Sequence, residues 1–319
     1  MTITELARLA HVSTSTVSKA FALLPEVSEL TRNMIFEVAK ANGCFKKFYR
    51  SEYPGLVFAV ICPELESTYY AAFVSEMQKR LSGYSCEVAV AATGFDAETE
   101  RRLIEYYRRY NTVDGIILID GVTDVASNTE TPIVTVNCVG GCKGAINVSV
   151  DIQNAISSVI EGWVSKGVTD IGFIGDQYTD ARLQNLRVAL WCASLAEREE
   201  YFIKAPGRFE ACGYAGALEL LKRESLPRAI LCAYDRIAVG TIRAFKERGV
   251  RVPDDVAVFG VDDAPGSKYG TPSLTSVSHR VDEVCRLAVE GLMAIIKGED
   301  FTSSIDVEPE LILRESSQI

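Results

Sequence analysis

The residue types most able to do chemistry come early in the chain, in the run Ser13-Thr14-Ser15-Thr16-Val17-Ser18-Lys19. Hydroxyl side chains compete with the backbone for hydrogen bonds and usually suit loops, yet this run lies where a helix should begin. Short hydroxyl side chains at a helix start can approach base edges and phosphates closely in a major groove. The run therefore favours DNA recognition; the alternative is a solvated three-helix cap on some other domain.

The remaining sequence lacks the common motifs of catalysis. It contains no GxxxxGKS/T phosphate loop, no GxSxG nucleophile elbow and no HExxH zinc motif. After residue 53 the only histidine is His279, which leaves few routes to histidine-based acid–base catalysis. Nine cysteines are spread through apolar segments, where reduced thiols pack as small hydrophobic side chains. We expect a protein that is not an enzyme and that holds neither a metal ion nor a cofactor.

Charge separates the first segment of the chain from the rest. Residues 1–53 hold seven Lys and Arg against five Asp and Glu, whereas the remaining residues hold 26 against 38. An acidic surface repels phosphate, so we expect contact with DNA to be confined to the first segment. Its basic residues include Lys19, Arg32, Lys40, Lys46, Lys47 and Arg50.

Three short helices must position the hydroxyl run. Residues typical of helix N-caps, namely Thr2, Ser13 and Ser28, precede three stretches with helical spacing of apolar side chains. Gly43 is a stop signal after the last of them. The predicted helices span residues 3–10, 14 to about 23, and 29 to about 42.

From Leu56 onward, short apolar β-type runs alternate with helical stretches, which is typical of parallel sheets covered on both faces. The predicted strands are Leu56–Cys62, Glu87–Ala92, Gly115–Ile119, Ile133–Val136, Ile171–Ile174, Ala229–Ala233 and Val256–Val261. The predicted helices are Tyr69–Leu81, Ala97–Tyr110, Gln153–Lys166, Ala181–Glu197, Cys212–Arg223 and Ile237–Arg248. This stretch is too long for one typical open sheet, so we expect two lobes, with ligands at the carboxyl ends of the strands.

Targeting signals are not evident in the sequence. The longest apolar runs fall far short of the ~18 residues that cross a bilayer. The N-terminus lacks the basic and apolar regions of a secretory signal. We therefore expect a cytoplasmic protein without a membrane span.

Three stretches of the first segment share one known pattern: Thr2-Ile3 to Leu9-Ala10, Val12-Ser13-x-x-Thr16-Val17-Ser18-Lys19, and Val27-Ser28-x-x-Thr31-Arg32. They resemble the DNA-binding segment of the lactose repressor (LacI/GalR) family. The resemblance implies base-edge contacts from Thr14, Ser15 and Lys19. It implies phosphate contacts from Ser13, Thr16, Ser18, Ser28 and Thr31. Ala22 stands where the family usually has an Asn that contacts the DNA backbone.

Four later stretches, at 249–258, 260–263, 274–277 and 310–316, are similar to signatures of the same family in order and spacing. The resemblance implies an α/β fold with a three-helix helix-turn-helix domain (1–45), a linker (46–55) and a two-lobed, periplasmic-binding-protein-like core of parallel sheets (56–319). The expected N-lobe spans about 56–151 and 280–302, and the C-lobe about 152–279 and 303–319. The function implied is that of a sequence-specific transcriptional regulator, with a repressor expected before an activator. The resemblance also implies that it binds its operator as a homodimer and holds a small effector between the lobes.

Sugar hydroxyls require charged or amide groups that form paired hydrogen bonds, and an aromatic face for the apolar side of the ring. The positions that match the family supply both. Arg182 matches its effector-binding arginine, Asp262 its effector carboxylate and Phe209 its ring-stacking aromatic. Further matching contact positions are Tyr69, Tyr70, Asn137, Asp151, Tyr234 and Asp235.

Two of these positions depart from the usual residues of the family. Tyr234 replaces an Asn, and Asn137 stands where Asp is common. A larger ring and an amide change the size and polarity of the pocket, so the effector is either sugar-like or a nucleobase or nucleoside that tyrosines could stack on. Two further alternatives stay open: a protein co-regulator replaces the effector, or a ligand-binding protein or enzyme carries a vestigial helix-turn-helix.

The linker also departs from the family pattern. Most members carry Pro-Asn and then a hinge helix whose Leu enters the minor groove. Here Lys46 and Lys47 occupy the Pro-Asn positions, Tyr53 falls where the Leu would be, and the linker is about three residues shorter. We therefore expect a short, poorly helical hinge and less DNA bending than is usual in the family.

Overall fold

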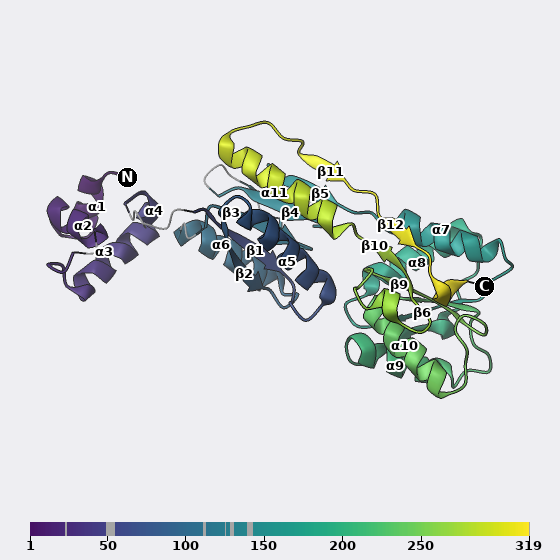
Figure 1. Ribbon diagram of the computed structural model, residues 1–319. Helices are drawn as coiled ribbons and strands as arrows, with labels where there is room; N and C mark the ends of the chain where they lie inside the picture. Colours follow the sequence, from purple (N-terminus) through teal and green to yellow (C-terminus); the bar gives the residue numbers. More distant parts are fainter. Residues whose placement is uncertain are drawn as a thin grey trace. The chain divides into compact units, whose positions relative to one another are not determined.

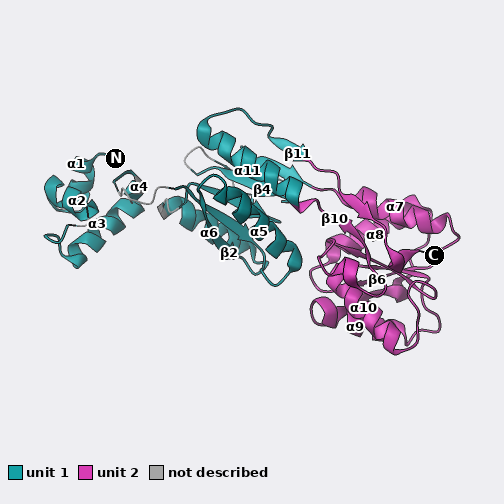
Figure 2. Cartoon of the chain, viewed as in Figure 1, with its two compact units in different colours: residues 1–149, 282–305 teal, residues 150–281, 306–319 magenta. Residues whose placement is uncertain are grey.

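The computed structural model describes residues 1–22, 24–48, 55–110, 113–124, 126–127, 131–138 and 143–318 (Figure 1). The chain divides into two compact units, residues 1–149 with 282–305 and residues 150–281 with 306–319 (Figure 2). We call residues 1–48 the headpiece, residues 55–149 with 282–305 the N-lobe, and the second unit the C-lobe. The chain passes between the units three times, at positions two or three residues from those expected.

The headpiece contains the helices α1 (Ile3–Leu9), α2 (Thr14–Phe21), α3 (Glu29–Ala41) and α4 (Phe45–Phe48). Thr2 forms a complete capping box with Glu5, and the Ser13 hydroxyl accepts a hydrogen bond from the Thr16 N–H at 3.0 Å. The core side chains are Leu6, Ala7, Ala10, Val17, Ala20, Phe21, Val27, Ile35, Ala39 and Cys44. Helices this short depend on tertiary packing for their stability, so the apolar face of each is what holds the headpiece together.

Helix α4 lies where the sequence predicted the start of a linker. The Phe45 ring packs at 5.0 Å from Phe36 and 5.7 Å from Phe21, and Phe48 lies 5.7 Å from Phe21. Lys47 donates a hydrogen bond to the backbone carbonyl of Met1 at 3.0 Å. Burial of two phenylalanines against the helix core explains why this turn joins the headpiece. The expected hinge position Tyr53, with the rest of 49–54, lies outside the described residues.

The N-lobe is a six-stranded sheet with the strand order β11-β5-β4-β3-β1-β2. Registers of the pairs β1–β2, β1–β3, β3–β4 and β4–β5 are parallel. The strands are β1 (Val57–Cys62), β2 (Glu87–Ala92), β3 (Gly115–Ile119), β4 (Ile133–Val136), β5 (Ile146–Ser149) and β11 (Ser304–Asp306). The helices are α5 (Thr68–Ser82), α6 (Ala97–Tyr110) and α11 (Val281–Lys297).

The C-lobe is a second six-stranded sheet, ordered β12-β10-β9-β8-β6-β7, with only β12 antiparallel to its neighbour among the described pairs. Its strands are β6 (Ile171–Gly175), β7 (Phe202–Lys204), β8 (Ala229–Cys232), β9 (Ala257–Val261), β10 (Thr275–Ser278) and β12 (Glu310–Ile312). Its α-helices are α7 (Gln153–Val164), α8 (Asp180–Cys192), α9 (Phe209–Leu220) and α10 (Asp235–Glu247). Short 3-10 turns occur at Glu199–Tyr201, Ser267–Tyr269 and Glu315–Ser317.

The predicted α/β class with two lobes of mainly parallel sheet is confirmed, and every predicted strand is present. The strands β5, β7, β10, β11 and β12 were not predicted. Each has only three or four residues, and none is as rich in apolar residues as the equally short β4 and β8, which were predicted.

Helices α9 and α10 pack with their backbones in contact. A Cβ atom on Gly213 would lie 1.9 Å from the Ile237 carbonyl oxygen, and one on Gly240 would lie 2.0 Å from the Glu210 carbonyl oxygen. Only glycine allows this approach, so the two helix starts, at Phe209 and Asp235, are held in a defined place. No helix among the described residues is long and apolar enough to span a bilayer.

Candidate functional site

The outer face of α2 presents the hydroxyl run to solvent. Thr14, Ser15, Ser18 and Lys19 are exposed, whereas Val17 is fully buried and faces the headpiece core. The Ser13 and Ser28 hydroxyls cap α2 and α3, and each also lies 2.8 Å from a threonine hydroxyl, Thr16 or Thr31. The N-terminal ends of two helices therefore combine exposed hydroxyls with positive helix-dipole ends, an arrangement suited to phosphate.

A hollow of about 370 Å³ lies between α2 and the start of α3. It is lined by Ser15, Thr16, Lys19, Glu26, Val27, Ser28 and Thr31. The structure thus brings together residues from two of the stretches that sequence analysis assigned to DNA. Arg32 stabilises the connection between α2 and α3. Its guanidinium donates to the carbonyl oxygens of Leu24 at 2.8 Å and Val27 at 3.1 Å.

The N-lobe contributes aromatic and amide groups that follow strand ends. Asn137 follows β4 and donates a hydrogen bond to the Tyr69 hydroxyl at 2.8 Å. The Tyr70 hydroxyl donates to the carboxylate of Asp120, which follows β3, at 2.9 Å. Asn137 and Asp120 both have positive φ, 54° and 49°, a backbone conformation that is uncommon outside glycine and that follows directly on the end of each strand. The structure brings Tyr69, Tyr70 and Asn137 together and adds Asp120.

The C-lobe gathers polar side chains at the carboxyl ends of four adjacent strands. In sheet order, His279 follows β10, Asp262 follows β9, Tyr234 lies two residues after β8, and Asp176 follows β6. Asp176 and His279 are buried, with 0% and 2% of their surfaces exposed. Four parallel strands must end at one edge of the sheet, so residues more than 100 positions apart in sequence meet there.

Arg182, on α8, reaches this group. Its Nη2 lies 3.4 Å from His279 Nε2, and Asp262 Oδ1 lies 3.5 Å from the same nitrogen. Burial raises the pKa of Asp262 to about 7, an effect that the Arg182 charge opposes. No described residue donates a hydrogen bond to the Asp262 carboxylate, and Arg182 Nε is buried without an acceptor among the described residues. Buried groups of this kind need a partner, which a bound ligand could supply.

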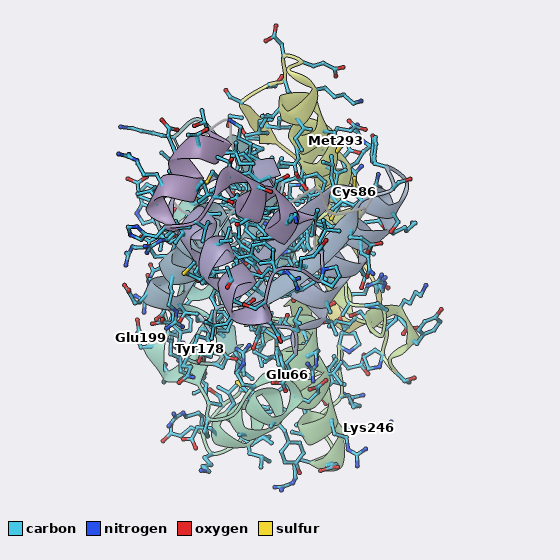
Figure 3. The ribbon with its side chains drawn as sticks, turned by 90° about the vertical axis from the view of Figure 1, so that its left-hand side faces the viewer. Glu66, Cys86, Tyr178, Glu199, Lys246 and Met293 are labelled. Carbon is cyan, nitrogen blue, oxygen red and sulfur yellow. The ribbon has the colours of Figure 1, made fainter. Side chains whose placement is uncertain are left out.

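Phe209 is covered rather than open. Only 3% of it is exposed, and the guanidinium groups of Arg236 and Arg208 lie 4.0 and 4.4 Å from the ring centroid. Arg208 also pairs with buried Asp176 at 2.6 Å and lies 4.7 Å from the ring of Tyr178, which Figure 3 labels. A ligand could stack on the Phe209 ring only if one of these arginine side chains moved aside. The two guanidinium groups therefore form the polar surface that covers the ring.

Two of the predicted effector residues, Asp235 and Asp151, use their carboxylates in hydrogen bonds to nearby protein groups. Asp235 is 1% exposed, and its carboxylate accepts hydrogen bonds from the Ala264 N–H at 2.7 Å and from the Ser267 and Ser276 hydroxyls. Its acceptors are thus directed into the protein, where they hold the turn after β9. Asp151 is exposed, and its carboxylate accepts a hydrogen bond from the N–H of Gln153, the first residue of α7, at 2.8 Å.

Comparison with known proteins agrees with this architecture. The family described as bacterial regulatory proteins, lacI family, matches residues 2–43, and a periplasmic binding protein-like domain matches residues 160–317. The chain is 27% identical over 328 residues to a ribose operon repressor from Haemophilus influenzae, covering 99% of this chain and 98% of the relative. It is 26% identical to the probable repressor ExuR from Bacillus subtilis, with the same coverage.

A solved structure of the transcriptional regulator CelR in complex with cellobiose covers 99% of this chain and 100% of that one, with a TM-score of 0.67 and 23% sequence identity. The chain belongs to the LacI family of bacterial regulatory proteins. LacI-family proteins are DNA-binding transcription regulators and not enzymes, so both of these expectations are confirmed.

Sequence analysis of this LacI-family regulator did not single out four polar residues that lie at these strand ends or pair with residues there: Asp120, Asp176, Arg208 and His279. Three of them are the first residue after a buried strand, which is a signal that the sequence carries. The ends of β3 and β6 were predicted correctly or to within one residue, so Asp120 and Asp176 could have been found. His279 follows β10, which was not predicted, and Arg208 is located only by its pairing with Asp176.

Proposed function

We propose that this LacI-family regulator is a transcriptional repressor whose operator binding is controlled by a small sugar-like metabolite. The observation that carries the proposal is a pair of opposite charges, Arg182 with a buried Nε and Asp262 with a side chain 7% exposed, which are not joined to each other among the described residues. A guanidinium donates and a carboxylate accepts, and vicinal hydroxyls can do both. A polyol therefore fits this surface better than an apolar ligand.

For DNA we propose the roles that follow from exposure and position on α2. Thr14, Ser15 and Lys19 contact base edges, and Ser13, Thr16, Ser18, Ser28 and Thr31 contact phosphates. The exposed hydroxyls and the two capped helix starts support this assignment. Because DNA is the partner, we place the protein in the cytoplasm.

For the effector we propose that Arg182, Asp262, Tyr234 and Phe209 act from the C-lobe and Tyr69, Tyr70 and Asn137 from the N-lobe. The names of relatives refer to ribose and cellobiose, which supports a carbohydrate. A nucleoside is the second candidate, because tyrosines occur among the proposed effector residues of both lobes. The ring of Tyr234 also lies 6.3 Å from that of Phe209. Asp151 and Asp235 have weaker support, since the Asp151 carboxylate is bonded to the Gln153 N–H of its own turn and the Asp235 carboxylate is turned inward.

We also propose a homodimer, because one recognition helix reads too few bases for specificity and two half-sites are needed. The C-lobe has a hollow of about 530 Å³ lined by α10 and by residues 266–274, with apolar walls from Val239, Ile242 and Leu274. Val239 is exposed, and Lys246, labelled in Figure 3, also lines the hollow. A second copy of the chain would cover these apolar side chains.

The effector proposal is tested by thermal shift against glucose, sucrose, cellobiose, ribose, adenosine and hypoxanthine. A true effector raises the Tm by mass action, and it should also change operator affinity. Arg182→Ala should abolish both responses and leave operator affinity intact. Arg187→Ala is the matched control, because this arginine of the same helix pairs with Glu197 and Glu199 instead.

Three results would count against the proposal. An Arg182→Ala protein that responds at the same ligand concentration would show that the site is elsewhere. No shift with any compound would favour a protein co-regulator. Ligand binding without any operator selected from a random DNA pool would favour a vestigial helix-turn-helix.

A further inference from the structure

Two opposite charges in the C-lobe converge on one imidazole nitrogen. Arg182 Nη2 and Asp262 Oδ1 lie 3.4 and 3.5 Å from His279 Nε2, yet no ion pair joins Arg182 to Asp262 among the described residues. An arginine and a carboxylate this near to each other ordinarily form a direct, often bidentate, pair. Since both atoms lie within 3.5 Å of one nitrogen, they are at most about 7 Å apart, and the imidazole contacts both groups where no direct pair is formed.

We propose that His279 is a positioning residue, a neutral wedge that keeps Arg182 and Asp262 apart so that each stays available to the effector. This inference rests on the proposed effector function of the C-lobe half-site. The wedge deepens that function, because it explains how opposite charges can coexist in a buried place without cancelling each other. A ligand then completes hydrogen bonds that the protein leaves unmade.

The charge state of His279 is suited to this role. Burial and the neighbouring Arg182 charge both hold the pKa of His279 well below 6.5, so the ring is neutral at physiological pH. A guanidinium can only donate, so Nε2 accepts from Arg182 and the ring proton lies on Nδ1. Nε2 then cannot donate to an ionised Asp262, whose oxygens remain free to accept from ligand hydroxyls.

The surrounding charges are also defined. Asp235 lies on α10. Burial, together with the charge of the neighbouring Asp262, raises the pKa of Asp235 to about 8. Tyr234 faces Arg182, Asp176, Asp262 and Arg208, and burial raises its pKa far enough that it stays neutral. The groups that titrate near neutrality at this edge of the sheet are therefore the two carboxyls, Asp262 and Asp235.

A consequence is that effector affinity depends on pH. Asp262, with its pKa of about 7, accepts hydrogen bonds through both oxygens, and with the strength of a charged acceptor, only when ionised. Affinity for a neutral polyol should therefore rise between about pH 6 and about pH 8. If the wedge is removed, a direct pair with Arg182 would lower the pKa of Asp262 and remove this dependence.

The first test needs no effector. The chain has only two histidines, so the imidazole ¹⁵N spectrum of the whole protein has two sets of signals, and His11→Gln identifies that of His279. We expect His279 to keep the signals of a neutral ring protonated on Nδ1 from about pH 5 to about pH 8. A small inflection near pH 7 should disappear in Asp262→Asn. A His279 ring that becomes charged near pH 6.5 would overturn the wedge.

The second test measures affinity with whichever of glucose, sucrose, cellobiose, ribose and adenosine raises the Tm. His279→Ala should weaken binding at least about ten-fold and flatten its pH dependence, because Arg182 closes on Asp262. His279→Gln, which keeps a neutral polar spacer, should stay within about three-fold of the original affinity and keep the pH dependence. Fluorescence of buried Trp163 checks that both variants fold.

The two proposals fail differently. Unchanged affinity and an unchanged pH profile in His279→Ala, with binding lost in Arg182→Ala and Asp262→Asn, would overturn the wedge alone. Unchanged binding in Arg182→Ala and Asp262→Asn would overturn the effector site itself. If His279→Ala does not fold, the imidazole spectrum and the pH profile of His279→Gln still decide the question.

Discussion

The headpiece and the C-lobe each gather polar side chains in one place, but they hold them in opposite ways. On α2 the side chains of Thr14, Ser15 and Lys19 are exposed, and they are neighbours in sequence. At the edge of the C-lobe sheet, Asp176 and His279 are almost fully buried and come from strands about 100 residues apart. The exposed side chains named here come from a single helix, whereas the buried ones follow different strands of one sheet.

This difference determines what substitution does. An exposed side chain on a helix contributes little to folding, so its replacement changes DNA binding and little else. When a buried charged residue is replaced, water cannot solvate the partner groups that it leaves unpaired. Its replacement therefore changes stability and ligand binding together. The comparison predicts that stability and function are separable in the headpiece and coupled in the C-lobe.

The largest expected effect is that of Asp235→Ala. It removes the acceptor of one N–H and two hydroxyls in a buried place, which should lower the free energy of unfolding of the C-lobe by about 3–5 kcal/mol. Both tryptophans, Trp163 and Trp191, lie in this lobe, so fluorescence in a urea titration follows it selectively. Asp235→Asn, which keeps an acceptor oxygen, should lose less. A loss below about 1 kcal/mol for the alanine variant would contradict the internal role.

Lys19→Ala should weaken operator binding by about ten- to a hundred-fold and relax specificity at one base position, because a base-edge contact is lost. The Tm and the effector response should not change. Lys40→Ala is a matched control, since it removes the same charge from a lysine that pairs with Glu37. Equal losses of operator affinity in the two variants would mean that only the net charge of the headpiece matters. The base-edge contact assigned to Lys19 would then be wrong.

Asp262→Asn should stabilise the free protein while it abolishes the effector response. The pKa of Asp262 is raised by burial to about 7 from an unfolded value near 3.8, so between these values the native state holds a proton that the unfolded state has lost. Stability from this group is present below about pH 4 and falls as pH rises to about 7. In Asp262→Asn this decline should vanish, with a gain at pH 7.5 on the order of 1–3 kcal/mol.

Urea titrations at several pH values measure this effect. The conservative control is Asp263→Asn, because the Asp263 carboxylate is partly exposed and pairs with Arg314 at 2.7 Å. Identical pH slopes in Asp262→Asn and the unsubstituted protein would show that this carboxyl is ionised without cost in the folded state.

The smallest expected effect concerns DNA shape. Helix α4 ends at Phe48 and packs on the headpiece core, so we expect operator bending below about 40°, the size of one sharp kink at a flexible step. Circular-permutation gel shifts give the bend angle. Phe48→Ala, which removes one of the two aromatic contacts between α4 and Phe21, serves as the comparison and should leave the angle within error or increase it. An angle well above 40° in the unsubstituted protein would show that the linker enters the minor groove.

Much of this architecture could be predicted from the sequence. Thr2, Ser13 and Ser28 were recognised as caps because a cap is a local signal, readable within four residues. The buried strands from β1 to β9 were recognised where their apolar runs reach four residues or more. The role of α4 was not, since nothing near Phe45 and Phe48 in sequence shows that Phe21 and Phe36 form an aromatic surface for them.

The hydroxyl run on α2 and the carboxyl that follows β9 show what each level of organisation decides. The sequence by itself determined which side chains face outward on α2, because a helix repeats every 3.6 residues and a capped start sets its phase. It also determined the α/β class through the alternation of apolar strands and helices. Only the tertiary structure decided that Asp262, His279 and Arg182 meet, that Asp235 turns inward and that arginines cover Phe209. The order of strands in a sheet is set by long-range packing, and no local pattern records which strand ends become neighbours.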